Sequence, residues 1–230
     1  MTTIKLQKGQ WSFNEGTAPS FDSHVEKSIP MYHEFHKEIS ELAYWFVKQG
    51  SNVIDIGSST GKVYRELSPL LEQRKAQYIG YDVAKDMVDL CNQEKYSNAE
   101  FIHRDVTELE SFPRVSLATA VFSLQFIDLE HRLSVLKNIY EALTLDGALI
   151  ITEKVLSTYS QISDIFNDRY QDFKFETLDA ENMLLKKQSL RGVMSLLTLE
   201  ENCNMLKVVG FKKIDVFMKW NNFAGIVAIK

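Results

Sequence analysis

Five short apolar runs that alternate with helical stretches constrain the fold of this chain more than any other feature of its sequence. The runs lie at residues 53–56, 78–81, 101–103, 116–124 and 148–152. Stretches in which apolar residues recur at helical spacing separate most of the runs, at residues 62–73, 84–94 and 129–143. Strands joined by such helical crossovers pair in parallel with right-handed connections. We therefore predict an α/β fold built on a doubly wound, mainly parallel sheet.

The C-terminal segment predicts one further helix and two further strands. Helical spacing covers residues 198–209, and two β-rich runs follow at residues 212–219 and 223–230. The short Trp-Asn-Asn connection at residues 220–222 favours an antiparallel pairing of these two runs. The predicted sheet therefore has seven strands and ends in an antiparallel hairpin.

The remaining segments are interpreted as parts of one domain that spans residues 1–230. Residues 1–30 begin with a polar stretch and predict an N-terminal tail or lid. Residues 31–48 carry a helical apolar stripe. Residues 157–197 are rich in charge and methionine and predict a helical insertion over the substrate side of the sheet.

Charge and cysteine content limit the classes of function. The chain carries 31 acidic and 26 basic residues, a net charge of −5, which argues against broad nucleic-acid binding because phosphates require clustered Lys and Arg. Cys91 and Cys203 lack metal-ligand spacing and form no disulfide framework. No apolar run has the length of a signal peptide or a membrane span. We expect a cytoplasmic protein without a metal site that acts on a small molecule.

A glycine-containing loop at residues 57–61 follows the first predicted strand, at the edge where open α/β sheets bind ligands. Its glycines let the backbone turn tightly, and the helix after it presents free N–H groups to an anion. Asp82 ends the second predicted strand, at the spacing typical of an acid that binds ribose hydroxyls. Asp105 and Val106 follow the third strand, where they can meet an adenine ring. Together these features indicate a nucleoside-containing cofactor, although either aspartate alone is also a common helix cap.

The sequence of this loop distinguishes among such cofactors. A nicotinamide fingerprint requires a third glycine and an ATP phosphate loop requires a Gly-Lys-Ser/Thr ending, and the loop has neither. A loop that begins with an acid, here Asp55, resembles motif I of class I S-adenosylmethionine (SAM)-dependent methyltransferases. The resemblance implies a Rossmann-like fold whose seven-stranded sheet ends in an antiparallel hairpin. We therefore expect SAM as the cofactor.

Further motifs, in the same order along nearly the whole chain, resemble the carboxy-SAM synthase family. They are SIPMY at residues 28–32, DIGSSTG at 55–61, FSLQF at 122–126, GALIITEK at 147–154, DFK at 172–174, KKQSLRGVM at 186–194 and the tail from residue 220. Members of that family are homodimers that convert SAM and prephenate into carboxy-SAM, which supplies a carboxymethyl group for wobble uridines of tRNA. The resemblance implies a homodimeric enzyme with a small-molecule substrate.

The resemblance also implies which residues line the cofactor site. Matched by motif, they are Tyr32, Gly57, Ser58, Ser59, Asp82, Val83, Asp105 and Val106. We expect Asp55, Gly61 and Phe122 to belong to the same site. Two positions depart from the family: Val121 replaces an Asn, and Lys187 replaces the Arg that holds the added carboxylate. This exchange is not conservative, because Arg pairs bidentately with a carboxylate and Lys is a point charge. Arg191, one helical turn later, is a second candidate for the carboxylate.

Three functions are compatible with these residues. The first is a SAM-dependent methyltransferase with a small, unidentified acceptor, since the two departures lie where the family's specificity is decided. The second is a carboxy-SAM synthase in which Lys187 and Arg191 bind the carboxylate, and the third is a SAM-binding protein without catalysis. No catalytic acid–base pair is recognisable, which is compatible with transfer from SAM because its sulfonium is already a leaving group.

Five polar residues outside the cofactor motifs carry alternative interpretations. We expect His33 and His36 to face solvent on their helix rather than to act in a substrate pocket. His103 is expected to be structural. Glu153 and Lys154 end the fifth predicted strand, where they either face the transfer site or pair with each other.

Overall fold

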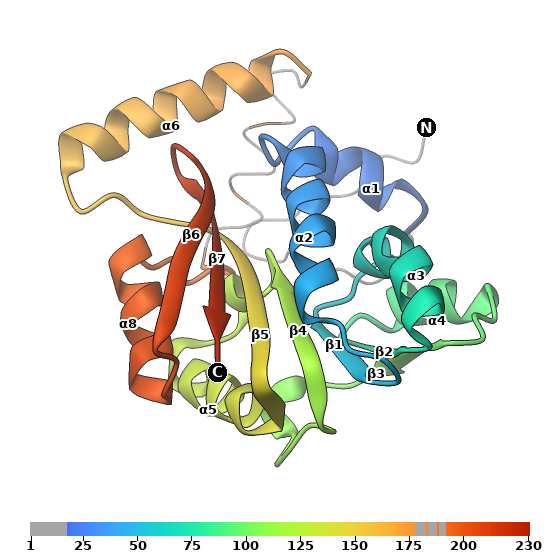
Figure 1. Cartoon of the computed structure of the whole chain (residues 1–230). Helices are drawn as coiled ribbons and strands as arrows, with labels where there is room; N and C mark the ends of the chain where they lie inside the picture. Colours follow the sequence, from blue (N-terminus) through green and yellow to red (C-terminus); the bar gives the residue numbers. More distant parts are fainter. Residues whose placement is uncertain (1–17, 178–182, 184–187, 189–191) are drawn as a thin grey trace.

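One mixed sheet of seven strands runs through the centre of the protein (Figure 1). The structure, a computed structural model, describes residues 18–177, 183, 188 and 192–230. The strands are β1 (Asn52–Ile56), β2 (Gln77–Asp82), β3 (Ala99–His103), β4 (Val115–Val121), β5 (Leu143–Lys154), β6 (Lys213–Trp220) and β7 (Phe223–Ile229). Their order is β3-β2-β1-β4-β5-β7-β6, and β7 runs antiparallel to both of its neighbours whereas β1 to β5 are parallel. The predicted doubly wound sheet with a terminal antiparallel hairpin is confirmed.

Helices cover both faces of this sheet (Figure 1). One face carries α2 (Tyr32–Phe46), α3 (Lys62–Arg74) and α4 (Lys85–Gln93), and the other carries α5 (Leu129–Ala142) and α8 (Leu199–Val209). Two short 3-10 helices, η1 (Val106–Glu108) and η2 (Leu124–Phe126), follow β3 and β4. None of the helices in the described part of the chain is long and apolar enough to cross a membrane.

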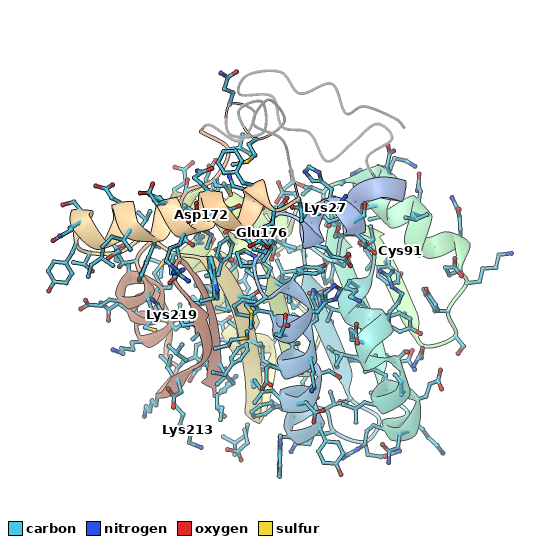
Figure 2. All side chains as sticks on the ribbon, turned by 90° about the horizontal axis from the view of Figure 1, so that it is seen from above. Lys27, Cys91, Asp172, Glu176, Lys213 and Lys219 are labelled. Atoms are coloured by element: carbon cyan, nitrogen blue, oxygen red, sulfur yellow. The ribbon has the colours of Figure 1, made fainter. Side chains whose placement is uncertain are left out.

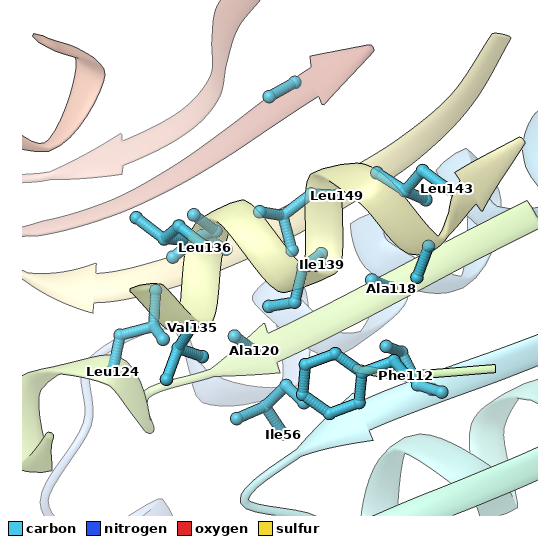
Figure 3. Packing of buried hydrophobic residues seen from close by; sticks show 14 of the residues in the cluster. Ile56, Phe112, Ala118, Ala120, Leu124, Val135, Leu136, Ile139, Leu143 and Leu149 are labelled. Atoms are coloured by element: carbon cyan, nitrogen blue, oxygen red, sulfur yellow. The ribbon is translucent and has the colours of Figure 1, made fainter. Parts of the chain in front are cut away.

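Alternation along the strands divides the buried side chains between two cores. Val53 packs with α2 and α3, whereas the next residue, Ile54, packs with α5. Figure 3 shows the second core, in which Leu136 and Ile139 of α5 lie against the sheet. Both faces are therefore apolar, which explains why the central strands read as nearly continuous apolar runs.

Three of the differences from the predicted boundaries have a clear structural reason. β4 ends at Val121 instead of residue 124, because Phe122 adopts a left-handed backbone with φ of 53°. β5 begins at Leu143 instead of residue 148, since the Asp146-Gly147 pair, typical of a turn, lies within the strand. The hairpin turn is shorter than the predicted connection, because Trp220 already pairs with Phe223.

Two helices lie over the carboxyl ends of the parallel strands. α1 (Ala18–Glu26) belongs to the predicted N-terminal tail, of which residues 1–17 lie outside the described part. α6 (Ser160–Phe175) is the described helix of the predicted insertion at 157–197, and Figure 2 shows it crossing the top of the molecule with Asp172 and Glu176 near one end. The two helices provide side chains that cover this edge of the sheet.

Candidate functional site

A cavity of about 750 Å³ opens at the carboxyl ends of the parallel strands. Its walls come from the loops that follow β1 to β5 and from α1, α2 and α6. At the centre, β1 and β4 are neighbours, and the chain order runs outward from them in opposite directions. Open α/β sheets bind ligands at the place where the strand order reverses in this way, called the topological switch point. The cavity therefore lies at the edge that the sequence indicates.

The loop at residues 57–61 forms the floor of the cavity between β1 and β4. Gly57, Ser59 and Gly61 all adopt positive φ angles, of 75°, 49° and 78°. The Gly57 and Ser58 amides both donate to the Tyr81 carbonyl, at 2.8 and 3.0 Å. A Cβ on Gly57 would lie only 2.5 Å from the Cβ of Ser123, which follows β4. Glycine is therefore required where the loops after β1 and β4 meet.

Asp55 supports this loop from below. The residue is fully buried, and its two carboxylate oxygens accept hydrogen bonds from the Tyr78 hydroxyl (2.5 Å) and the Thr119 hydroxyl (2.7 Å). Burial raises the pKa of the Asp55 carboxyl to about 6, although the hydrogen bonds from Tyr78 and Thr119 lower it. Asp55 thus ties the end of β1 to both neighbouring strands, while its contact with a ligand stays a prediction.

Asp82 and Asp105 stand at the ends of β2 and β3, and both also cap local backbone. Asp82 accepts from the Ser59 amide (2.7 Å) and the Ala84 amide (2.8 Å). Asp105 accepts from the amide and the hydroxyl of Thr107, at 2.9 and 2.7 Å. A carboxylate has about four acceptor positions, so a cap can still accept from a ligand hydroxyl. Capping and ligand binding are therefore compatible at both residues.

The structure brings most of the predicted cofactor residues onto one cavity wall. These are Tyr32, Asp55, Gly57, Ser58, Ser59, Asp82, Val83, Asp105, Val106 and Phe122. Gly61 does not line the cavity, and a Cβ there would lie 3.1 Å from the Phe101 ring and 3.2 Å from the Cys91 sulfur. Lys187 and Arg191 lie outside the described residues.

The expectation that His36 faces solvent is wrong. Its side chain is 3% exposed, lines the cavity and meets the Tyr32 ring edge-on, with ring centroids 4.5 Å apart. Burial, followed by the positive charge of Lys62, lowers the pKa of His36 to about 4. His33 is exposed, as expected, and an imidazole nitrogen of His103 lies 3.1 Å from the Val83 carbonyl in a structural contact.

Glu153 and Lys154 point to opposite faces of β5, so they do not pair with each other. Lys154 lines the cavity, and its ammonium lies 4.4 Å from the centroid of the Tyr170 ring. Lys174, one turn after Tyr170 on α6, holds its ammonium 4.4 Å from the same centroid. We call Lys154, Tyr170 and Lys174 the lysine–tyrosine wall. The sequence analysis missed this wall, because it joins a strand end to a helix that is distant along the chain.

Glu153 lies on the other face, buried near Arg132 of α5. Burial raises the pKa of its carboxyl to about 8, although the Arg132 charge and the Leu124 and Gln125 amides lower it. Folding then favours the protonated form, so the folded protein loses stability relative to the unfolded chain as pH rises from 4.5 to about 8.

We expect the Glu153→Gln variant to lack this loss of stability. The melting temperature of the variant should therefore rise relative to that of the parent protein as the pH increases over this range. Parallel melting curves across that range would contradict the assignment.

Comparison with known proteins identifies the family. Residues 53–147 match the methyltransferase domain family. The carboxy-S-adenosyl-L-methionine synthase of Staphylococcus epidermidis is 43% identical over 224 residues, which cover 96% of this chain and 97% of that protein. The protein of the same name from Methylococcus capsulatus is 33% identical over 226 residues, covering 96% of this chain and 93% of that protein. This chain belongs to the carboxy-SAM synthase family.

Solved structures agree with the carboxy-SAM synthase assignment at the level of the fold. The YcgJ protein from Bacillus subtilis has a TM-score of 0.63 at 16% identity, covering 86% of this chain and 99% of that chain. A SAM-dependent methyltransferase from Aquifex aeolicus has a TM-score of 0.59 at 17% identity, covering 92% and 97%. This carboxy-SAM synthase family member is therefore a SAM-dependent transferase with a Rossmann-like fold, and the predicted SAM cofactor is confirmed.

The cavity of this carboxy-SAM synthase family member also fits a polar ligand such as SAM. The hydroxyls of Ser58, Ser59 and Ser123 are buried around the 57–61 loop and have no hydrogen-bond partner among the described residues. Buried polar groups in folded proteins are rarely left without a partner. These hydroxyls are therefore available to a ligand that carries several donors and acceptors, as the nucleoside of SAM does.

Replacing Asp82 with alanine is expected to weaken SAM binding by about 1–3 kcal/mol, because ribose hydroxyls and the Ser59 amide lose their acceptor. Isothermal titration calorimetry with SAM measures the change. Asp89→Ala, which removes an exposed carboxylate of α4 that pairs with Lys85, is the matched control. Unchanged SAM affinity in Asp82→Ala would show that Asp82 only ties the loop to α4.

Proposed function

We propose that this protein is a carboxy-SAM synthase that makes carboxy-SAM from SAM and prephenate. The observation that carries the proposal is the lysine–tyrosine wall, which presents two ammonium groups around one aromatic ring inside the cavity. Prephenate carries one carboxylate on its ring and a second on its pyruvyl side chain. The wall offers opposite charge to the carboxylates and an aromatic surface to the ring. The names of the two relatives support the same activity.

The wall lies away from the residues assigned to the nucleoside. Lys154 ends β5, whereas Asp82 ends β2, and β1 and β4 lie between these strands. Three steps across a sheet amount to about 14 Å, since neighbouring strands lie about 4.8 Å apart. A cavity of about 750 Å³ therefore has one acidic end for the nucleoside and one cationic end for a second, anionic reactant.

Described contacts hold this cationic end in place. The Tyr170 hydroxyl donates to the Ser28 carbonyl (2.8 Å), which ties α6 to the segment before α2. The Gln125 side chain accepts from the Lys154 amide (3.0 Å), which fixes the end of β5 against η2. Lys154 and Lys174 thus orient a carboxylate while Tyr170 and Phe223 exclude water from one side of it.

SAM supplies a carbon that its sulfonium activates, so the protein has chiefly to align two reactants in a dry site. In this cavity α1 and α6 cover the strand ends. Asp22 of α1 accepts from the Thr60 hydroxyl (2.5 Å) and pairs with Arg65 (2.7 Å), which fastens α1 to the loop and to α3. We propose that the segment before residue 30 acts as a lid through these contacts.

Mass spectrometry of a reaction mixture tests the function. With SAM and prephenate together, we expect a product heavier than SAM by the mass of one CO2, and no such product when either reactant is omitted. Formation of S-adenosylhomocysteine together with a methylated acceptor would instead establish a plain methyltransferase. Unreacted SAM in the presence of prephenate would contradict the proposal.

We also propose that the protein is a cytoplasmic homodimer whose product serves the carboxymethylation of tRNA without direct tRNA binding. Free thiols at Cys91 and Cys203 are typical of a reducing compartment. α6 exposes Ile162 and Ile165, and 51% of the Ile165 surface is accessible. Because exposed apolar clusters often mark association surfaces, we propose that α6 lies in the dimer interface. Light scattering of the purified protein is expected to give twice the chain mass of 26.5 kDa.

The Ile165→Glu variant tests this surface. A charge placed in an apolar interface is expected to shift the light-scattering mass to that of a single chain, because the carboxylate loses water without gaining a partner. Val208→Glu changes an exposed valine on a different helix, α8, and serves as the control. A parent protein that is monomeric, or an Ile165→Glu variant that stays dimeric, would rule out this role for α6.

A further inference from the structure

His36 is a buried polar side chain that the proposed chemistry does not use. It is 3% exposed and lines the cavity, and neither of its two ring nitrogens has a hydrogen-bond partner among the described residues. Its ring packs against that of Tyr32, with centroids 4.5 Å apart, and this contact gives no hydrogen bond to either nitrogen. A buried donor and acceptor left without partners cost stability unless a ligand or water satisfies them.

The surroundings of His36 indicate the kind of ligand. Lys62 is the first residue of α3, lines the same cavity and is a charged neighbour of His36. α3 has 13 residues and begins directly after the 57–61 loop, so its first amides lie at the positive end of a helix dipole. Glu66 and Asp22 are the acidic neighbours of His36, and each already pairs with a cation, Lys62 or Arg65. Because these ion pairs balance one another, the preference of this corner for an anionic group on the ligand comes from the first amides of α3.

The imidazole is a neutral hydrogen-bonding group in this corner. Burial and the charge of Lys62 lower the pKa of His36 to about 4, so one nitrogen donates and the other accepts at neutral pH. Such a group can donate to a carboxylate, or accept from an ammonium, without bringing a charge of its own into the site.

We propose that His36 binds the amino-acid end of SAM, with an imidazole N–H donating to its carboxylate beside Lys62. The inference rests on SAM binding over the 57–61 loop, because the nucleoside is then at Asp82 and Asp105 on one side of that loop. α2, which carries His36, packs against α3 on the other side of the same loop. The amino and carboxylate groups of SAM form its other end, and His36 and Lys62 line the cavity on that side from α2 and α3.

The test separates the two ends of the cofactor. S-adenosylhomocysteine carries the nucleoside and the amino acid, whereas 5′-methylthioadenosine carries the nucleoside and the thioether alone. Calorimetry on His36→Phe, which keeps an aromatic ring against Tyr32, is expected to show about tenfold weaker binding of S-adenosylhomocysteine, as for loss of one hydrogen bond to a charged group. Binding of 5′-methylthioadenosine is expected to be unchanged.

Two further variants complete the design. His36→Gln, which keeps a donor and an acceptor, is expected to recover part of the lost affinity. His33→Phe, an exposed histidine on the same helix, is expected to bind both ligands as the parent does. Equal weakening of both ligands in His36→Phe, or no weakening of either, would overturn the inference. If the parent protein binds neither ligand, the SAM site itself is wrong, and this result is distinct from a failure of His36 alone.

Discussion

Gly57→Ala is expected to abolish measurable SAM binding and to destabilise the protein. Gly57 has a φ of 75°, and an added Cβ would lie 2.5 Å from the Cβ of Ser123. Alanine at positive φ and a forced shift of the loop after β4 together are expected to lower the free energy of unfolding by about 2–4 kcal/mol. A displacement of about 1 Å in a preorganised site can lower the catalytic rate roughly 100-fold. We expect the affinity for SAM to fall by at least the same factor.

Gly50→Ala separates the two causes. Gly50 also has a positive φ, of 64°, but nothing lies within 4 Å of the position that a Cβ would take. This control therefore carries the backbone penalty, about 1 kcal/mol, without the contact with Ser123. Thermal unfolding and calorimetry with SAM compare the two variants. If Gly57→Ala binds SAM like Gly50→Ala, the close approach of the loops after β1 and β4 does not shape the cofactor site.

Lys174→Met is expected to lower the formation of carboxy-SAM by roughly 10–100-fold while leaving the affinity for SAM within about twofold. A hydrogen bond to a charged partner contributes about 1.5–3 kcal/mol, and methionine keeps the apolar stem of the lysine without its ammonium. The residue is 7% exposed and lines the cavity, and under the proposed function we expect loss of its charge to act on the second reactant. Steady-state kinetics with varied prephenate should place the loss in kcat/KM for prephenate.

Lys219→Met is the matched control for this variant. The Lys219 ammonium also lies over an aromatic ring, 5.0 Å from the centroid of Phe166, but the residue does not line the cavity. Figure 2 shows Lys219 beside α6. We expect its removal to leave both SAM affinity and turnover unchanged. If Lys174→Met turns over as fast as the parent protein, or if turnover falls equally in both variants, the lysine–tyrosine wall does not bind the second reactant.

Local patterns predict the fold well, because each strand and helix carries its own periodicity. The parallel strands and the hairpin follow from apolar runs and their spacing. The start of β5 does not, because residues 144–146 at its beginning are polar or exposed and the Asp146-Gly147 pair is typical of a turn. The end of β4 is likewise set by the backbone of Phe122 at the site rather than by the apolar run that continues beyond it.

The positions of His36, Glu153 and Lys154 could have been predicted from residue spacing alone. His36 lies one turn after Tyr32 and three residues before Ile39, and these two residues are buried on the face of α2 that turns inward. Helical spacing therefore places His36 on the buried face. Alternation along a strand likewise separates Glu153 from Lys154. The meeting of Lys154 with Tyr170 depends on how α6 folds back over β5, and no local pattern encodes such a contact.

In the proposed reaction, this cavity moves a carboxyl carbon from prephenate to SAM. Loss of the ring carboxyl group as CO2, together with the ring hydroxyl as hydroxide, makes the ring of prephenate aromatic. The hydroxide takes a proton from the methyl group of SAM and becomes water, and the methyl carbon then bonds to the carbon of CO2. The most direct measurement uses prephenate labelled with carbon-13 in that ring carboxyl and follows the label by mass spectrometry. We expect the label to appear in carboxy-SAM. Recovery of the label only as free CO2, with SAM unchanged, would show that the protein does not transfer this carbon.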